Sequence, residues 1–477
     1  TPARALMLQA TSGKRQTRAF RDRGLDRRAA SLVACGCLLA VALGSGLALT
    51  DRPGSEQVAR IVVTGAAGAL LTVAVAVVRF DWLLLGVLVS RLALDGLATG
   101  DTSLTAGAAV SGLFAVVAGP RLLVGALRSS LAPVSSLTKA LYGLALCALF
   151  SAALAGNRAG ALEGALEITA GALMFGALEQ ELQKRPKLAR QVLVAVCLSA
   201  VVPVGVALVQ LATGTGNLET TGIVRIHGTA VHPTPFAGYL ALVAVAVLMY
   251  TNWSSLRAKL LGGGALAVLC LLILLTYTRS AWLALLLAVV YIALRTRPVI
   301  LIPLIVGVIA IYSYVPGVQT RVDELRGIAH ARAEDNSLAW RLEYWTRLVE
   351  AGGRASARNA IIGSGLDYVH DTDDSSLQPH NIFVQAYVEL GVLGLASLIG
   401  VILGYAVHVR QARRNAQDAL ARQAATALAA VGIVLLIQGM ASNVLTQPML
   451  YWYAAAVGLF GYRGVVAPTP TTQGARV

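Results

Sequence analysis

The chain has 477 residues, of which 56% are hydrophobic and only 13% are charged, and its formal net charge is +15. Because a soluble domain of this size carries about a quarter charged residues, this composition excludes an ordinary soluble protein and indicates a membrane protein. The positive charge is distributed among the turns between apolar segments and forms no single patch, which argues against a nucleic-acid partner.

Apolar segments long enough to span a bilayer recur along the whole chain. A helix needs roughly 17–25 apolar residues to cross the hydrocarbon core, and helices are expected because lipid offers no partner to an unpaired backbone group. The sequence predicts up to fourteen spans, and twelve if the short or glycine-interrupted ones are not true spans. They are 30–49, 57–78, 80–98, 103–119, 134–155, 160–178, 189–212, 233–250, 258–277, 280–295, 298–315, 383–406, 422–446 and 448–466.

The basic residues predict the orientation of these spans. With fourteen spans every lysine falls in turns on one side, which the positive-inside rule identifies as cytoplasmic, together with both termini. The predicted organisation is a basic cytoplasmic tail (1–29), a helical bundle (30–315), a loop on the opposite side (316–381), C-terminal spans (382–466) and a second cytoplasmic tail (467–477). Loops as long as 316–381 are usually functional.

The long loop contains seven arginines and ten acidic residues but no lysine. Arginine without lysine is typical of planar, multi-donor contacts, either to carboxylates of the loop itself or to phosphate. Within the loop, Glu334–Ala351 predicts an amphipathic helix, with Leu338, Leu342, Trp345 and Val349 at helical spacing. Trp340, Tyr344 and Arg347 form a second stripe, which suits a helix at the bilayer interface.

The candidate functional residues all lie on the predicted extracytoplasmic side. His380 precedes a span and is a candidate general base, although a cap at a helix start is the alternative. Arg225, Arg279 and Arg341 reach the same side from distant parts of the chain. Arg279 sits in a tight turn among apolar residues, where it is either a snorkelling anchor or a group that needs an anionic partner.

One histidine and several arginines, without metal-ligand spacing, indicate a phosphate-bearing lipid substrate. Guanidinium groups bind phosphate oxygens and stabilise a leaving group, and the histidine takes a proton from an attacking hydroxyl. This chemistry is transfer from a lipid diphosphate and needs no metal or cofactor. By contrast, Arg91 and Asp95 are one helical turn apart inside a span and are either a paired polar site or a neutralised buried pair.

Five segments, in this order, make the sequence resemble the O-antigen ligase family, over roughly residues 190–450. They are RIHGTAVHPTPFAGYL (Arg225–Leu240), TYTRSAWLALL (Thr276–Leu286), AWRLEYWTRL (Ala339–Leu348) followed by IIGSGLDY, and PHNIFVQAYVELGVLGL (Pro379–Leu395). The family pattern more often has Asn where Thr234 or Pro235 stands here, so the role of that turn is an open point.

The resemblance implies a GT-C-type glycosyltransferase fold with about 12 (12–14) transmembrane helices and one large periplasmic loop that contains helices. It implies a multi-pass protein of the bacterial inner membrane, which takes glycan from undecaprenyl diphosphate at the periplasmic face. The acceptor that the resemblance implies is a sugar hydroxyl of the lipid A–core oligosaccharide, and the implied transfer is metal-independent and inverting. Besides the donor glycan and the acceptor, the implied partners are membrane lipids.

By the same resemblance, His380 is the base that activates the acceptor hydroxyl, and Arg225, Arg279 and Arg341 bind the diphosphate. Asn381 and Tyr387 are weaker candidates for orientation and lining, with a helix cap as the simpler interpretation of Asn381. Glu389 is expected to make a buried polar contact inside the span.

Other functions are compatible with the same residues. An O-antigen polymerase or a protein O-oligosaccharyltransferase would use the same donor site with another acceptor. A lipid-oligosaccharide transporter is less favoured, because a transporter is expected to carry its charged residues near the middle of the spans.

Overall fold

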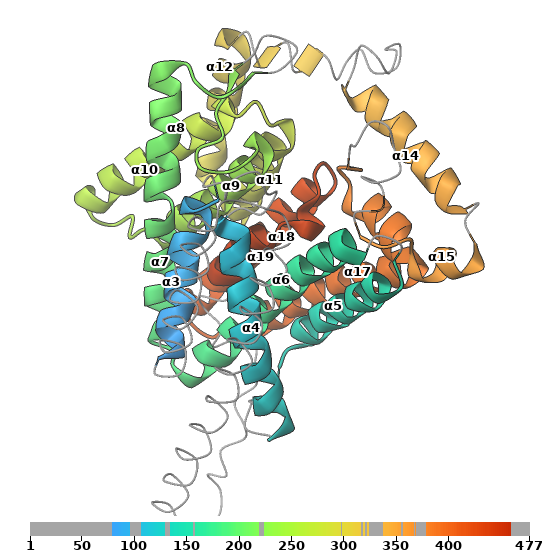
Figure 1. Cartoon of the computed structure of the whole chain (residues 1–477). Helices are drawn as coiled ribbons and strands as arrows, with labels where there is room; N and C mark the ends of the chain where they lie inside the picture. The colour runs from blue at the N-terminus through green and yellow to red at the C-terminus, as the bar shows by residue number, and fades with distance from the viewer. Residues whose placement is uncertain are drawn as a thin grey trace, which may run out of the picture. The chain divides into compact units, whose positions relative to one another are not determined.

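The computed structural model describes residues 79–95, 106–128, 134–155, 158–218, 224–296, 298–315, 318–319, 322–323, 337–353, 356–366, 368 and 378–458. Over these residues the chain is almost entirely helical, and the strands described are one short antiparallel pair (Figure 1). Nine of the described segments are long and apolar enough to cross a membrane. The predicted class, an all-α polytopic membrane protein, is therefore confirmed.

The chain divides into two compact units. One consists of Thr1–Leu84 and Val116–Val124, and the other of Leu85–Ala115 and Gly125–Val477. Among the described residues of the first unit, the Arg121 guanidinium lies over the Phe80 ring, 4.4 Å from its centroid. All the candidate functional residues belong to the second unit, to which the following description applies.

The helices occur in the order that the apolar segments predict. The first described helices are α3 (Phe80–Ala93), α4 (Ala106–Leu127), α5 (Ser136–Leu154), α6 (Arg158–Lys184), α7 (Leu188–Ser199) and α8 (Val201–Thr213). Strands β1 (Asn217–Leu218) and β2 (Val224–Arg225) follow, with Asn217 opposite Arg225. The later elements are α9 (Pro233–Tyr250), α10 (Leu256–Leu275), α11 (Arg279–Thr296), η1 (Pro298–Ile300), α12 (Leu301–Tyr314), α14 (Ser337–Gly353), α15 (Ala357–Ile362), α17 (Ile382–Arg414), α18 (Ala419–Gly439), η3 (Val444–Thr446) and α19 (Pro448–Gly458).

Several predicted spans differ from the helices of the structure in continuity or length. The span predicted at 189–212 consists of two helices, α7 and α8, that meet at Ala200. Helix α17 continues past the predicted end at 406, so His408 lies inside a helix, where it is 1% exposed. Helix α12 has 14 residues, fewer than a full span needs. The spans predicted at 30–49 and 57–78 and both tails lie outside the described residues.

The core of the second unit is formed where α19 packs against α6, α9 and α18. The rings of Tyr239 and Tyr453 meet edge to face, with centroids 4.6 Å apart. The polar groups of two buried aromatic residues of α19 have partners inside the bundle. The Tyr453 hydroxyl donates to the Leu88 carbonyl (2.6 Å), and Trp452 Nε1 donates to the Ala170 carbonyl (3.1 Å). Buried indole and phenol groups need such partners, so these contacts fix how α19 sits in the bundle.

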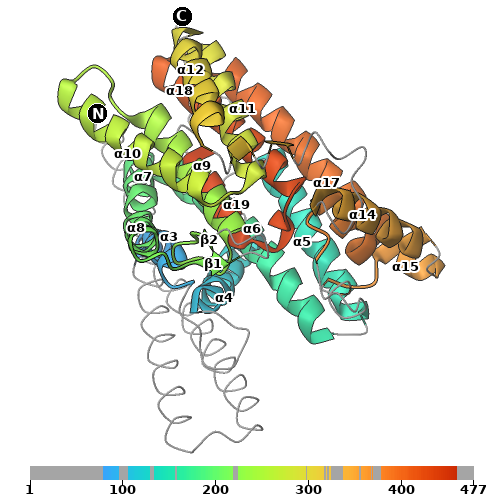
Figure 2. The ribbon, with the colours of Figure 1, turned by 90° about the horizontal axis from the view of Figure 1, so that it is seen from above.

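A break in α17 connects the bundle to the helices of the long loop. Gly391 has φ 70° and ψ −168°, a conformation that glycine adopts without strain. The turn after α15 fits into this break, because Ser364 N donates to the Val388 carbonyl (3.3 Å) and Gly365 N donates to the Glu389 carbonyl (3.0 Å). Helix α17 also packs along α5, which lies beside α6 (Figure 2).

Helix α14 is the amphipathic helix that the loop sequence predicts, and it packs the aromatic residues of its sequence against α17. Tyr344 is 2% exposed and packs on Val388 of α17, whereas Leu342 and Val349 are 48% and 44% exposed. The aromatic rings of the second stripe provide more area to bury against α17 than the aliphatic side chains do.

Candidate active site

Arg225 is held in place by the turn between α10 and α11. It is the last residue of β2, and its Nε donates to the Thr276 carbonyl at 2.6 Å. One terminal nitrogen, Nη2, donates to the Thr278 hydroxyl at 2.9 Å. The same turn leads directly into Arg279, so the chain ties these two arginines to one short piece of backbone.

Arg279 is the first residue of α11 and is half-buried. The turn before it is stabilised by its own side chains, since the Thr276 hydroxyl donates to the Ile273 carbonyl at 2.7 Å. The next residue, Ser280, donates to Gln438 Oε1 on α18 at 2.9 Å. The start of α11 is therefore fixed against α18 as well as against β2.

Arg341 comes to the same place from α14. Its Nη1 donates to the Ala441 carbonyl, just after α18, at 3.2 Å. Burial lowers the pKa of Arg341 below its usual value, and the positive charges of Arg279 and Arg225 lower it further. These influences show that the three predicted arginines, which are up to 116 residues apart in sequence, lie close together.

His380 lies directly before α17 in a left-handed backbone conformation, with φ 52°. Its backbone N–H donates to Asn443 Oδ1 at 2.7 Å, and its Nδ1 lies 3.3 Å from Asn443 Nδ2. The pKa of His380 falls from 6.5 to about 4, first because of burial and then because of the positive charges of Arg341 and His232. The ring is therefore neutral at pH 7 and belongs to the same cluster as the arginines.

The structure gives the three weaker candidates different positions. Asn381 caps α17, because its Oδ1 accepts from the backbone N–H groups of Phe383 (2.9 Å) and Val384 (3.3 Å). Tyr387 packs among the aromatic residues between α14 and α17. Glu389 is 1% exposed, and its backbone carbonyl accepts from the Ser151 hydroxyl at 3.1 Å.

Two histidines of the segment before α9 have distinct structural roles. His227 Nδ1 lies 2.7 Å from the Ala230 carbonyl, and Gln210 accepts from the backbone N–H groups of His227 (3.0 Å) and Gly228 (2.9 Å). This histidine therefore shapes the turn. His232 is the N-cap of α9, where its Nδ1 accepts from Thr234 N at 3.3 Å, and it is exposed beside His380.

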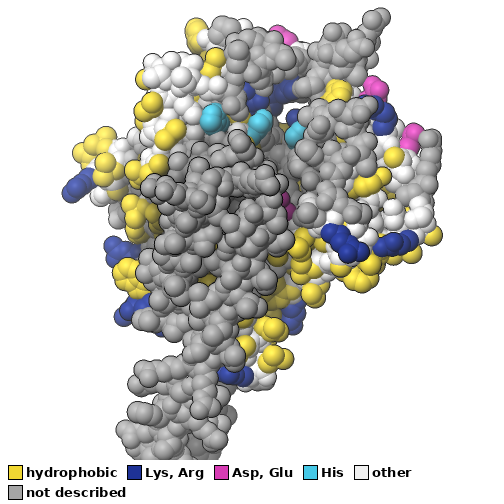
Figure 3. Space-filling view, viewed as in Figure 1, with side chains coloured by type: hydrophobic (Ala, Val, Ile, Leu, Met, Phe, Trp, Pro, Cys, Tyr) yellow, Lys and Arg dark blue, Asp and Glu magenta, His cyan; other side chains and the backbone are white. Residues whose placement is uncertain are grey.

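The cluster lies where several helices begin. Helices α9, α11 and α17 start at Pro233, Arg279 and Ile382, so their positive dipole ends are at the same end of the bundle as the cluster. Figure 3 shows histidine side chains and Lys/Arg side chains close together on one face of the molecule. Helix dipoles and guanidinium groups together favour an anion.

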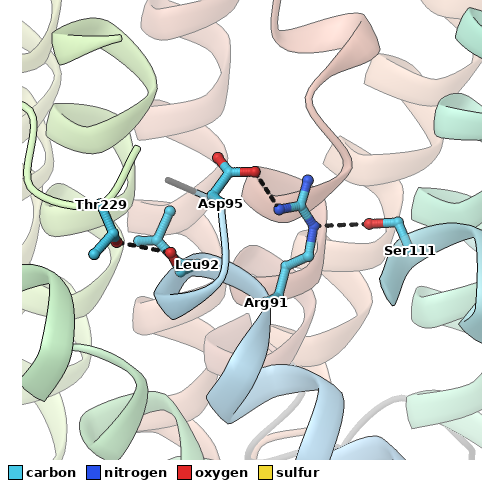
Figure 4. Close-up of polar contacts among 5 residues, drawn as sticks. All are labelled: Arg91, Leu92, Asp95, Ser111 and Thr229. Atoms are coloured by element: carbon cyan, nitrogen blue, oxygen red, sulfur yellow. Dashed lines mark hydrogen bonds and ion pairs between the residues drawn. The ribbon is translucent and has the colours of Figure 1, made fainter. Parts of the chain in front are cut away.

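Arg91 and Asp95 form a buried, neutralised pair. Arg91 Nη1 contacts Asp95 Oδ1 at 2.6 Å, and its Nε donates to the Ser111 hydroxyl at 2.7 Å (Figure 4). Next to them, the Thr229 hydroxyl donates to the Leu92 carbonyl at 2.7 Å and ties the turn before α9 to α3. Each of the two charges has its partner inside the protein. Of the two interpretations of the sequence, a neutralised buried pair therefore accounts for Arg91 and Asp95.

Sequence reasoning missed three residues of the cluster. Asn443 binds His380, Trp345 Nε1 donates to the Pro379 carbonyl at 2.5 Å, and His232 influences the His380 ring. Asn443 falls near the end of the span predicted at 422–446, and His232 lies in the segment RIHGTAVHPTPFAGYL, but neither residue was given a role. Trp345 was assigned to an apolar stripe, and nothing in its spacing indicated a hydrogen bond.

The arrangement suits the binding of an oxyanion next to a proton acceptor. An anion placed among the guanidinium groups offsets the repulsion that lowers the pKa of Arg341, and guanidinium forks match phosphate oxygens. A neutral imidazole at pH 7 can take a proton from a hydroxyl. Among the residues that the structure describes, no three His, Cys, Asp or Glu side chains are grouped so as to hold a metal ion.

Comparison with known proteins identifies the region that contains most of this cluster. A family model described as "O-Antigen ligase" matches residues 264–399. The match includes Arg279, Arg341 and His380, whereas Arg225 and Asn443 lie outside it. No curated protein matches the chain.

Proposed function

We propose that this chain, whose residues 264–399 match the family model described as "O-Antigen ligase", transfers a glycan from undecaprenyl diphosphate to a sugar hydroxyl of lipid A–core. The observation that carries the proposal is the convergence of Arg225, Arg279 and Arg341, from three separate elements, beside a neutral His380. Transfer from a lipid diphosphate uses this combination of an anion site and a proton acceptor.

The three arginines and the helix N-termini are the proposed diphosphate site. The two bonds that hold Arg225 use its Nε and one Nη, so its fork is already oriented before the donor arrives. Orientation in advance lowers the entropy lost on binding. The polyprenyl chain would lie along the lipid-facing side of the apolar helices, several of which expose large aliphatic side chains.

In the proposed reaction His380 takes the proton of the acceptor hydroxyl while the acceptor oxygen forms a bond to the anomeric carbon of the glycan. The bond from that carbon to the phosphate oxygen breaks on the opposite side, which inverts the configuration. The electron pair of the broken bond goes to the diphosphate, and the guanidinium groups stabilise the negative charge that develops there. Since these groups supply the positive charge, we expect transfer to continue in excess EDTA.

The positive-inside pattern supports placing this reaction at the periplasmic face of the bacterial inner membrane. Lys187, between α6 and α7, and Lys259, in the first turn of α10, are at the opposite ends of their helices from the cluster. The exposed Leu342 and Val349 of α14 support an acceptor embedded in the membrane, because they provide an apolar surface next to Arg341.

A transfer assay with separate acceptors tests the proposal. Purified full-length protein in lipid nanodiscs would receive undecaprenyl diphosphate-linked glycan with lipid A–core, with a second donor molecule alone, or with periplasmic protein. Arg279→Ala is compared with Arg257→Ala, because Arg257 is exposed at the other end of α10, about 30 Å away by helix geometry.

We expect product on lipid A–core from the wild type and Arg257→Ala, and none above background from Arg279→Ala. If the only product is lengthened glycan, the donor site is retained in the proposal and the chain is a polymerase. If the only product is glycosylated protein, the chain is a protein O-oligosaccharyltransferase. No product with any acceptor from folded wild-type protein would contradict the proposed function.

A further inference from the structure

One peptide group, the amide between Pro379 and His380, is held from both sides by residues distant in sequence. Its carbonyl oxygen accepts from Trp345 Nε1 of α14 at 2.5 Å. Its N–H donates to Asn443 Oδ1, in the connection between α18 and α19, at 2.7 Å. Because a left-handed backbone is unfavourable for a residue with a side chain, the conformation of His380 depends on these two bonds.

The bond to the backbone also determines how the Asn443 amide is oriented. Only the amide oxygen can accept from the His380 N–H, so the other amide atom, which faces the ring, is the Nδ2 donor. Nδ2 lies 3.3 Å from His380 Nδ1 and also donates to Gln378 Oε1. A donor at that position requires a lone pair on Nδ1, so in the neutral ring the proton is on Nε2.

We propose that Asn443 is a positioning residue for His380, which fixes the resting ring in the tautomer with its proton on Nε2 and, together with Trp345, locks the peptide group that presents the ring. This inference rests on the proposed function of His380 as the proton acceptor. In this tautomer Nδ1 is the nitrogen that takes the acceptor's proton, and Nε2 remains a hydrogen-bond donor.

The Asn443 amide can give up its hydrogen bond to His380 Nδ1 because it has a second acceptor, Gln378 Oε1. When the proton moves from the acceptor oxygen to Nδ1, the Asn443 amide keeps its hydrogen bond to Gln378 Oε1, and the ring becomes an imidazolium with N–H groups on both sides. An Nε2–H group also suits the surroundings, since an oxyanion bound by Arg341 would be repelled by a lone pair and attracted by a proton.

The two hydrogen bonds to the Pro379–His380 peptide group, from Trp345 and to Asn443, form a clamp, and this clamp also links His380 to the proposed diphosphate site. Trp345 and Arg341 are four residues apart on α14, so they lie one turn apart on neighbouring positions of the same helix. Arg341 donates to the Ala441 carbonyl, two residues before Asn443. Trp345 and Asn443 are therefore both attached to elements that position the diphosphate. A bound lipid diphosphate that orders Arg341 also restricts the motion of the His380 ring.

The substitution Asn443→Asp separates the two roles of Asn443. A carboxylate still accepts from the His380 backbone N–H, but its second oxygen accepts from Nδ1–H, which moves the lone pair to Nε2. We expect kcat to fall at least about tenfold, with a donor KM close to that of the wild type. The acid limb of the rate profile should move to higher pH, because the carboxylate stabilises the imidazolium against Arg341 and His232.

Trp345→Phe and Asn415→Asp complete the comparison. Phenylalanine keeps an aromatic ring between α14 and α17 but cannot donate to Pro379, so we expect a lower kcat without a shift of the acid limb. Asn415 is exposed at the end of α17 and lies outside the cluster, so Asn415→Asp should behave as the wild type. An Asn443→Asp enzyme with wild-type kcat and an unshifted acid limb would overturn the proposal.

A spectroscopic measurement on the wild-type chain tests the tautomer without any activity. In protein labelled with 15N-histidine, the signals missing from His380→Gln belong to His380. The proposal predicts a pyridine-type shift for Nδ1 and a pyrrole-type shift for Nε2 at pH 7, and the opposite assignment would refute it. If the tautomer is as predicted but the wild type transfers no glycan, the proposed function fails and the role of Asn443 as the group that sets the tautomer stands.

Discussion

The substitution Gly391→Ala tests whether the break in α17 is required to build the site. The backbone of Gly391, with φ 70° and ψ −168°, is in a region open almost only to glycine. A Cβ atom there would lie 2.4 Å from the Ile361 carbonyl oxygen and 2.5 Å from Gly363 N, which are backbone atoms of the docked turn. The strain of such a conformation is about 1–3 kcal/mol, and because these contacts cannot be relieved by a rotamer change we expect a value near the upper end.

Gly400→Ala is the matched control in the same helix. A Cβ atom at Gly400 would meet nothing within 4 Å, and alanine is favoured over glycine inside a helix by about 1 kcal/mol. The two variants should therefore change stability in opposite directions, although the chemical change is identical.

Thermal unfolding in one detergent and at one scan rate is the appropriate assay, since unfolding of such proteins is often irreversible. We expect Gly391→Ala to unfold below the wild type and Gly400→Ala at or above it. The donor-dependent activity of Gly391→Ala should also fall, because the segment Ile382–Leu390 before the break presents His380. A Gly391→Ala protein as stable as Gly400→Ala would refute this account of the break.

Three further predictions concern the cluster itself. For the free enzyme, kcat/KM should stay level from pH 8 to 5 and fall as the pH drops through about 4, where His380 takes up a proton and ceases to be a base. Arg225→Lys should raise the donor KM more than it lowers kcat, since one ammonium group cannot reproduce both bonds to Thr276 and Thr278. Tyr344→Ala should destabilise the protein by roughly 3 kcal/mol, measured by thermal unfolding, and raise the donor KM, because Tyr344 anchors α14.

The apolar segments and the basic turns were sufficient to predict the helical class and the order of the helices. Hydropathy over about twenty residues reports directly on the environment of a helix, so this part of the fold is a local property. Helix α14 was predicted for the same reason. Its buried face was not, because both the aliphatic and the aromatic stripe fit the helical period, and only the neighbouring α17 decides between them.

The residues of the cluster were predicted by chemical type and by the side of the membrane, but their convergence was not. Arg225, Arg279 and Arg341 meet through contacts between elements far apart in sequence, which no local pattern encodes. Asn443 is 63 residues from His380 and resembles any polar residue in a turn. Likewise, the left-handed conformation of His380 depends on two long-range hydrogen bonds that only the folded chain supplies.

The central claim is that His380 and the arginine cluster together transfer glycan from a lipid diphosphate. A single-turnover assay tests it most directly: excess full-length enzyme in nanodiscs, a limiting amount of undecaprenyl diphosphate-linked glycan, lipid A–core and excess EDTA. The account predicts transfer by the wild type and a loss of about 10²–10⁴-fold in rate for His380→Ala, with donor binding retained. A folded His380→Ala enzyme that transfers glycan at the wild-type rate would contradict the account.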